Sequence, residues 1–233
     1  MSGQLERLSR DLGADLLGVA DLSHFQPYSD MDNSLLNFPF GISIGMRLSD
    51  SIIDRITVAD PTPKYAHHYK AANALLDNIA LRIANRIQGE GYAALPIPAS
   101  QTTRIEQYQG AISHKAVAAL AGLGWIGKSQ LLINSEFGPR LRLASILTTI
   151  PLKLGTPLGN KCGECNVCIR ACPAHAIKSA KDIKGRWVRE EVFSPDACYQ
   201  RLLRFRDDPR YGVSICGVCV KVCPVGSKRS KKK

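Results

Sequence analysis

All eight cysteines of this 233-residue chain lie in one segment, and this clustering constrains the fold more than any other feature of the sequence. Residues 1–161 contain no cysteine, whereas residues 162–223 contain all eight. The N-terminus has no apolar run after a basic segment, so we expect a cytoplasmic protein without an export signal. Because a reducing cytosol disfavours disulfides, thiolate ligation of metal within a single module is the better interpretation.

The first cysteine motif has the form C-x2-C-x2-C-x3-C-P and comprises Cys162, Cys165, Cys168, Cys172 and Pro173. Three cysteines at this spacing let a short turn wrap one face of an iron-sulfur cubane, but the same loop cannot also bring the fourth onto that cluster. In ferredoxins with two clusters, the fourth cysteine, which precedes a proline, ligates the other cluster. Zinc sites use cysteine pairs separated by longer spacers, so the uninterrupted run favours iron and sulfur.

The second motif comprises Cys216, Cys219, Cys223 and Pro224, and it lacks a leading cysteine. Cys198 is the one remaining cysteine that could complete it; the alternative, an unliganded buried thiol, would leave the second cluster one ligand short. The crosswise rule then predicts two 4Fe-4S clusters. Their ligands would be Cys162, Cys165, Cys168 and Cys223 for one, and Cys172, Cys198, Cys216 and Cys219 for the other.

The positive charge of the chain is concentrated in the same region as the cysteines. Residues 1–160 hold 14 Lys+Arg against 13 Asp+Glu, whereas residues 161–233 hold 17 against 7. A cubane with four thiolates has a charge of about −2 when oxidised, so part of this basicity compensates the clusters. The basic tail, residues 227–233, could attract an acidic redox partner or nucleic acid, but a solvated, disordered tail is the favoured interpretation.

Helical and strand patterns alternate in the cysteine-free part of the chain. The pattern predicts helices over residues 5–12, 49–56, 63–88 and 114–124. It predicts strands over residues 16–22, 41–46, 91–98 and 141–150. Ser49 could cap its helix, and the longest helix carries Leu75, Ile79, Ile83 and Ile87 on one stripe.

These patterns divide the chain into two domains and a tail. We expect an α+β fold with an N-terminal domain over residues 1–155, a cluster module over residues 156–226 and the basic tail. Nowhere do 18 apolar residues follow one another, so no membrane association is expected.

The run from Gly122 to Ser129 matches two phosphate-binding patterns, G-x4-G-K-[ST] and G-x-G-x-x-G. Both patterns require a strand before the glycines and a helix after them, because the phosphates bind at the N-terminus of that helix. Here a helix comes first and a strand follows, so we do not expect Lys128 to bind a nucleotide phosphate. Trp125 could be an apolar wall for a ligand; the alternative is a left-handed helix cap at Gly122 with Trp125 in the core.

Three histidines are weaker candidates. His67 and His68 lie in the long predicted helix, and His114 begins the helix before the glycines. A histidine in a helix is usually a polar surface residue, and a role as ligand or proton donor is the minor alternative for each.

The run AGLGWIGKS at 121–129, followed by LLIN, LTTIPL and CGECNVCIRACPAHAI, resembles the epoxyqueuosine reductase family and its relatives. The resemblance covers about residues 60–226, and the order of the motifs is more specific than any one of them. It implies a cobalamin-binding domain of nitroreductase-like topology joined to a two-cluster ferredoxin-like module, as in reductive dehalogenases. It also implies that the clusters supply electrons to a corrinoid lying against the glycine run.

The resemblance suggests a cofactor site in the glycine run. The residues concerned are Gly122, Gly124, Trp125, Ile126, Gly127 and Lys128. The glycines could let the backbone approach a flat ring, and Trp125 and Tyr108 could form apolar walls around it.

Two departures from the family pattern bear on the substrate. The family carries an acidic proton donor after the Gly-Tyr strand, whereas residues 95–103 of this chain read LPIPASQTT. The helical extension that follows the clusters in many members, and helps to hold tRNA, is not present after Cys223. We therefore expect a short relative for which tRNA is not the substrate; otherwise Glu106 or His114 would have to deliver the proton.

We interpret the chain as an iron-sulfur oxidoreductase or electron-transfer protein. A donor such as ferredoxin or flavodoxin would supply low-potential electrons through two clusters to a small-molecule or corrinoid acceptor at the N-terminal domain. One alternative is a cobalamin-dependent reductase of the epoxyqueuosine reductase type. Another is a non-enzymatic carrier or activator that docks on a corrinoid protein.

Overall fold

The computed structural model describes the whole chain apart from residues 24–34, 36, 101–109, 179–188 and 228–233. It divides into two compact units, each assembled from segments that are distant in sequence. The sheet unit consists of Met1–Arg47, Ala71–Trp125 and Leu141–Gly159, and the cysteine unit consists of Leu48–Lys70, Ile126–Arg140 and Asn160–Lys233.

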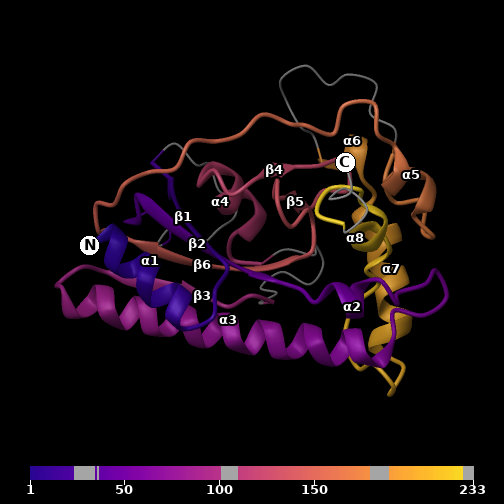
Figure 1. The fold of residues 1–233 in the computed structure, drawn as a ribbon, viewed down its shortest axis with the longest axis horizontal. Helices are drawn as coiled ribbons and strands as arrows, with labels where there is room; N and C mark the ends of the chain where they lie inside the picture. Colours follow the sequence, from indigo (N-terminus) through magenta and orange to yellow (C-terminus); the bar gives the residue numbers. More distant parts are fainter. Residues whose placement is uncertain (24–34, 36, 101–109, 179–188, 228–233) are drawn as a thin grey trace. The chain divides into compact units, whose positions relative to one another are not determined.

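A four-stranded antiparallel sheet forms the centre of the sheet unit (Figure 1). Its strands lie in the order β1 (Leu16–Asp21), β2 (Phe40–Arg47), β6 (Leu141–Thr148) and β3 (Ala94–Ile97). In the register, Ile42 pairs with Val19 on one side and with Ile146 on the other. Each predicted strand is therefore confirmed, and β3 is shorter than its pattern suggested.

Side chains from the two faces of this sheet enter different hydrophobic clusters, because successive residues of a strand point to opposite faces. Val19, Ile42 and Ile146 join the cluster that contains the apolar residues of α1 (Ser2–Asp11) and α3 (Pro63–Gly89). Ala20 and Leu147 join the other cluster with Val117 of α4 (His114–Leu120). Helices thus cover both faces, which explains why β2 and β6 are buried over most of their length.

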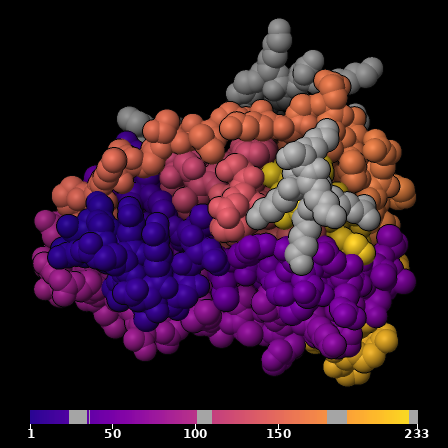
Figure 2. Space-filling model, in the orientation of Figure 1, coloured from indigo at the N-terminus to yellow at the C-terminus, as the bar shows by residue number. Residues whose placement is uncertain are grey.

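The helix α3 confirms the long helical prediction. Ile79, Ile83 and Ile87 are fully buried along one stripe, and each such side chain contributes about 1.5–3 kcal/mol by leaving water. Residues up to Lys70 belong to the cysteine unit, and Ala71 onward belongs to the sheet unit. The shorter α1 buries Leu5 and Ser9, and the N-terminal segment that contains it forms the indigo surface in Figure 2.

Glycine and serine at the helix ends act mostly as predicted. Gly13 and Gly122 adopt positive φ angles of 102° and 74° just after α1 and α4. Ser113 caps α4 by accepting a hydrogen bond from the Ala116 N–H. The expected cap at Ser49 is wrong in its chemistry, because its side chain makes no capping hydrogen bond to α2 (Asp50–Ile53).

The cysteine unit contains short helices joined by turns. After α2 come α5 (Val167–Ala171), α6 (Arg189–Val192), α7 (Pro195–Arg206) and α8 (Val218–Val222). The strands β4 (Trp125–Ile126) and β5 (Leu132–Ile133) form a separate two-stranded sheet. Among the described residues, no helix is long and apolar enough to cross a membrane.

Candidate iron-sulfur site

The two cysteine motifs fold in the same way within the cysteine unit. In each, a short helix begins inside the motif, α5 in the first and α8 in the second, and these helices pack against each other. Cys172 and Cys223 end the helices with extended backbone angles. A residue before proline is driven out of the helical region, so the Cys-Pro pair forces the last cysteine of each motif away from its own helix.

The first set of thiols comprises Cys162, Cys165, Cys168 and Cys223. Burial raises the pKa of Cys168, and negative charge on Cys162 and Cys165 raises it further. Burial also raises the pKa of Cys223 to about 11; a backbone hydrogen bond at Val225 opposes this, and the other three thiols of the set add to it. The charges of three thiols of the first motif therefore act on Cys223.

The second set is defined by Cys219. Burial is the largest cause that raises the pKa of this thiol above its ordinary value. The charges of Cys216, Cys198 and Cys172 raise it further, and the charge of Cys168 from the first set adds least. Cys198, which lies on α7, thus influences the pKa of Cys219 together with thiols of both motifs. These electrostatic influences connect thiols of the two motifs, and the assignment of each thiol to one cluster is a prediction.

These thiols suit a centre that brings positive charge. All eight are free and partly buried, and four thiolates close together would repel one another unless iron compensated them. Within the described part of the chain, no three side chains of His, Cys, Asp or Glu are arranged to share one metal ion. A cubane has a different requirement, since its four thiolates bind four different iron atoms.

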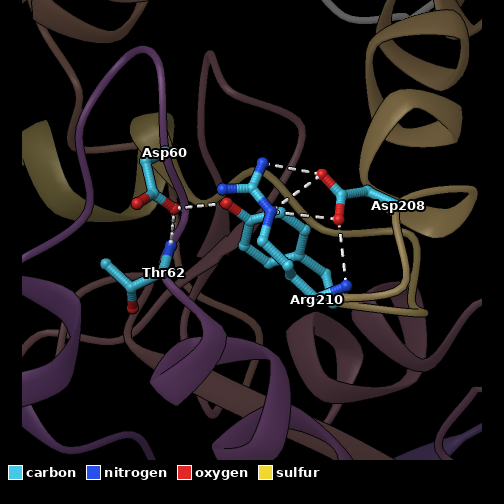
Figure 3. Close-up of polar contacts among 5 residues, drawn as sticks. Asp60, Thr62, Asp208 and Arg210 are labelled. Atoms are coloured by element: carbon cyan, nitrogen blue, oxygen red, sulfur yellow. Dashed lines mark hydrogen bonds and ion pairs between the residues drawn. The ribbon is translucent and has the colours of Figure 1, made fainter.

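A loop from Ile56 to Thr62 contacts the segment that carries the second cysteine motif, and no local sequence pattern indicates this contact. Lys221 Nζ donates to the Ile56 carbonyl at 2.5 Å, and Arg201 donates to the Val58 carbonyl. The Tyr211 hydroxyl donates to Asp60 Oδ1 at 2.7 Å, the oxygen that also accepts from the Thr62 N–H (Figure 3). These donors come from three separate parts of the segment that carries the second set.

The same loop leaves no room for a side chain at Gly217, which lies between Cys216 and α8. Gly217 has a φ of 77°, and a Cβ there would lie 2.6 Å from Ile56 Cδ1 and 2.8 Å from Tyr65 Cε1. Only glycine combines this conformation with this close approach.

The glycine run occupies two environments. In the sheet unit, Gly122 has the left-handed conformation, and a Cβ on it would lie 2.5 Å from the Thr156 carbonyl oxygen. Gly124 and Trp125 are buried, and Trp125 is 4% exposed, which agrees with the alternative of a helix cap and a core tryptophan. In the cysteine unit, Lys128 Nζ donates to the Gly163 carbonyl. The order of helix α4 before the run and strand β5 after it is confirmed.

Two of the three candidate histidines, His68 and His114, have hydrogen-bond partners within the protein. His68 Nε2 accepts a hydrogen bond from the Ser49 N–H at 3.0 Å, and burial followed by the charge of His67 lowers its pKa. His114 Nε2 lies 3.0 Å from the Pro98 carbonyl and therefore carries the proton, so Nδ1 accepts from Ser145 Oγ at 2.9 Å. Both ring nitrogens of His114 are thus engaged. Glu106 and Tyr108 lie outside the described residues.

Acid should weaken the fold through His114. Burial is the main cause that lowers its pKa, so its stabilising contribution is complete above about pH 6.5 and decreases as the pH falls through the lower pKa of the folded state. We expect the urea midpoint of wild-type protein to fall between pH 7.5 and 5.5. The fall should be smaller in His114→Gln, which has lost this titrating group, and part of it should remain because His68 still titrates. An equal fall in both proteins would contradict this role for His114.

Residues 161–226 match the family described as the 4Fe-4S double cluster binding domain. The segment that carries all eight cysteines therefore has the sequence of a domain that binds two such clusters. The predicted kinship with epoxyqueuosine reductases is confirmed as well. The epoxyqueuosine reductase of Listeria monocytogenes is 35% identical over 123 residues, which is 49% of this chain and 30% of that relative.

Solved structures show the same fold over nearly the whole chain. A catabolic reductive dehalogenase has a TM-score of 0.77 at 20% sequence identity. The match covers 95% of this chain and 31% of the dehalogenase chain. Epoxyqueuosine reductase from Streptococcus thermophilus has a TM-score of 0.62 at 18% identity, with 97% and 66% covered. The mixed α/β fold is therefore shared with both kinds of enzyme, whereas their activities do not follow from this likeness.

Proposed function

We propose that this chain is an iron-sulfur oxidoreductase that passes low-potential electrons through two 4Fe-4S clusters to an acceptor bound by the sheet unit. The observation that carries the proposal is that all eight thiols lie inside the segment that matches the double-cluster family, where Cys219 and Cys223 are influenced by thiols of both motifs. When bound, each cluster would exchange one electron at a time. A donor such as ferredoxin or flavodoxin would supply these electrons.

In this proposal, the eight cysteines bind the clusters crosswise. Cys162, Cys165, Cys168 and Cys223 hold one cluster, and Cys172, Cys198, Cys216 and Cys219 hold the other. The Cys-Pro pairs supply the crossing ligands because they end α5 and α8 in extended backbone. The contacts of Lys221, Arg201 and Tyr211 with residues 56–62 fix the segments from which the second set projects.

The composition of anaerobically purified protein tests this function directly. We expect brown protein with about eight iron atoms and about eight acid-labile sulfides per chain, because two cubanes each contain four of both. Iron and sulfide analysis, with zinc measured in the same sample, provides the result. Stoichiometric zinc without labile sulfide would refute the proposal.

A second candidate function is that of a cobalamin-dependent reductase of the epoxyqueuosine reductase type. It is supported by the fold shared with a reductive dehalogenase whose structure is described in terms of B12-dependent dehalogenation, over 94% of this chain. The cofactor site expected in the glycine run stays a prediction; within the run, Trp125 is buried and Lys128 Nζ binds the Gly163 carbonyl. Cobalt retained after incubation with cobalamin and gel filtration would favour this candidate, and its loss would favour a carrier that docks on a corrinoid protein.

We do not propose tRNA as the substrate. The stretch 95–103 contains no acidic residue where the related enzymes place a proton donor, and both nitrogens of His114 are engaged. Turnover of epoxyqueuosine-containing tRNA by cluster-replete protein would overturn this exclusion.

A further inference from the structure

The lysine that resembles a phosphate-binding residue instead contacts the first cysteine loop. Lys128 Nζ donates to the Gly163 carbonyl at 2.7 Å and to Asn166 Oδ1 at 3.0 Å. Gly163 directly follows Cys162, and Asn166 directly follows Cys165. Two hydrogen bonds therefore fix the Lys128 ammonium beside Gly163 and Asn166, each of which follows a proposed ligand. A lysine without such bonds would not hold its charge in one place.

The backbone of Ile126, just before Lys128, is connected to the start of the same cysteine loop at Cys162. Asn160 Nδ2 donates to the Ile126 carbonyl at 2.9 Å, and Asn160 Oδ1 accepts from the Cys162 N–H at 2.8 Å. Asn160 thus connects the backbone of the segment to the first ligand. At Gly127, a Cβ would lie 3.3 Å from Cys162 Sγ and 2.7 Å from Ile133 Cγ1, so the missing side chain is what leaves space for this thiol.

From these contacts we propose that the segment from Ile126 to Lys128 positions the cluster of the first set and that the Lys128 ammonium raises its reduction potential. The inference rests on the proposed iron-sulfur function. Reduction adds one electron to a centre that is already negative, and a fixed cation nearby stabilises the reduced form more than the oxidised form. Hydrogen bonds and charges around the ligands are general determinants of cluster potential.

Three replacements of Lys128 separate charge from hydrogen bonding. Lys128→Arg keeps the charge, Lys128→Gln keeps a donor without the charge, and Lys128→Met removes both. Each protein would be prepared anaerobically with its clusters and titrated with dithionite while electron paramagnetic resonance follows both clusters. The first-set signal is the one that Cys223→Ala removes.

Lys128→Gln and Lys128→Met should both lower the potential of the first-set cluster and leave the other unchanged. At the wild-type midpoint, the ratio of reduced to oxidised first-set cluster should fall about threefold to tenfold, and Lys128→Arg should stay near wild type. Unchanged potentials in a Lys128→Met protein that retains both clusters would overturn the inference alone. Wild-type protein without clusters would overturn it together with the proposed function.

Gly127 provides an independent test of the positioning role. Gly127→Ala places a methyl group against Cys162 and Ile133, so we expect loss of the first-set cluster and about half of the wild-type iron. Gly159→Ala is the matched control, because a Cβ at Gly159 meets nothing within 4 Å. Full iron content in Gly127→Ala would contradict the close fit, and equal loss in both variants would show that the effect is not specific to this segment.

Discussion

Cys172→Ala should eliminate the cluster bound mainly by the second motif, and Cys223→Ala should eliminate the one bound mainly by the first. Each replacement removes one of four thiolates from a cluster whose other ligands lie elsewhere in the sequence. The expected loss is about half of the iron, from about eight atoms to about four per chain. This is a larger effect than a shift in potential, because a cubane with three protein ligands is easily lost.

The signals of the two clusters identify which one is missing. Cys172→Ala should match a Cys216→Ala variant in its electron paramagnetic resonance spectrum, and Cys223→Ala should match Cys165→Ala. Arg170→Ala is a suitable control, since this exposed residue lies between Cys168 and Cys172 and is expected to keep both clusters. If each variant instead resembled others from its own motif, the crosswise assignment would be wrong.

Local patterns predicted most of the elements because local physics determines them. The spacing of Ile79, Ile83 and Ile87 specifies one helical face, and all three are buried on the same side of α3. Gly13 and Gly122 end helices because they accept a left-handed backbone without steric cost. The cysteine spacing was equally informative, since the Cys-Pro pairs leave their helices for a reason that acts on neighbouring residues.

Contacts between distant segments could not be predicted in this way. Lys128 meets Gly163 and Asn166, and no local pattern distinguishes this lysine from one that binds phosphate. Tyr211 and Asp60 are likewise separated by most of the chain. The sequence could also not decide between a core and a ligand-facing Trp125, because both environments favour a large apolar ring.

Each compact unit is assembled from segments that are distant in sequence, so composition along the chain does not indicate which residues belong to which unit. Charge and cysteine content change near residue 161, and this suggests a boundary along the chain. The cysteine unit nevertheless includes Leu48–Lys70 and Ile126–Arg140, which contain no cysteine. These segments supply the loop from Ile56 to Thr62 and Lys128, so much of the surroundings of both thiol sets comes from residues whose composition carries no sign of metal.

Arg140 is the residue outside the thiol sets whose loss should cost the cysteine unit most. Its guanidinium donates to Asp50 Oδ1 at 2.9 Å and to Asp54 Oδ1 at 2.7 Å. Arg140 is 2% exposed and Asp50 is 8% exposed, whereas Asp54 is about half exposed. Arg140 therefore fixes both ends of α2, the helix that leads into the loop from Ile56 to Thr62.

Arg140→Met should destabilise the protein by about 3–5 kcal/mol, because it removes the guanidinium that pairs with the buried Asp50 carboxylate. The measurement is the urea midpoint of cluster-replete protein under anaerobic conditions, followed by far-UV circular dichroism. Arg206→Met is the matched control and should change the midpoint little, since its partner Asp207 is exposed and the pair is surrounded by solvent.

A second replacement at Asp50 distinguishes the lost ion pair from lost packing. If the cost of Arg140→Met comes from the loss of the cation beside the buried Asp50 carboxylate, Asp50→Leu in the same chain should recover much of it, because it removes that buried charge. If the cost comes from the volume and contacts of the arginine, the second change should add to the first. Iron content measured on the same samples shows whether α2 matters for the second set, which depends on the loop that follows this helix. If Asp50→Leu restores both the urea midpoint and the iron content, the buried ion pair supports the cluster through that loop. If all variants contain equal iron, Arg140 has a role in folding alone.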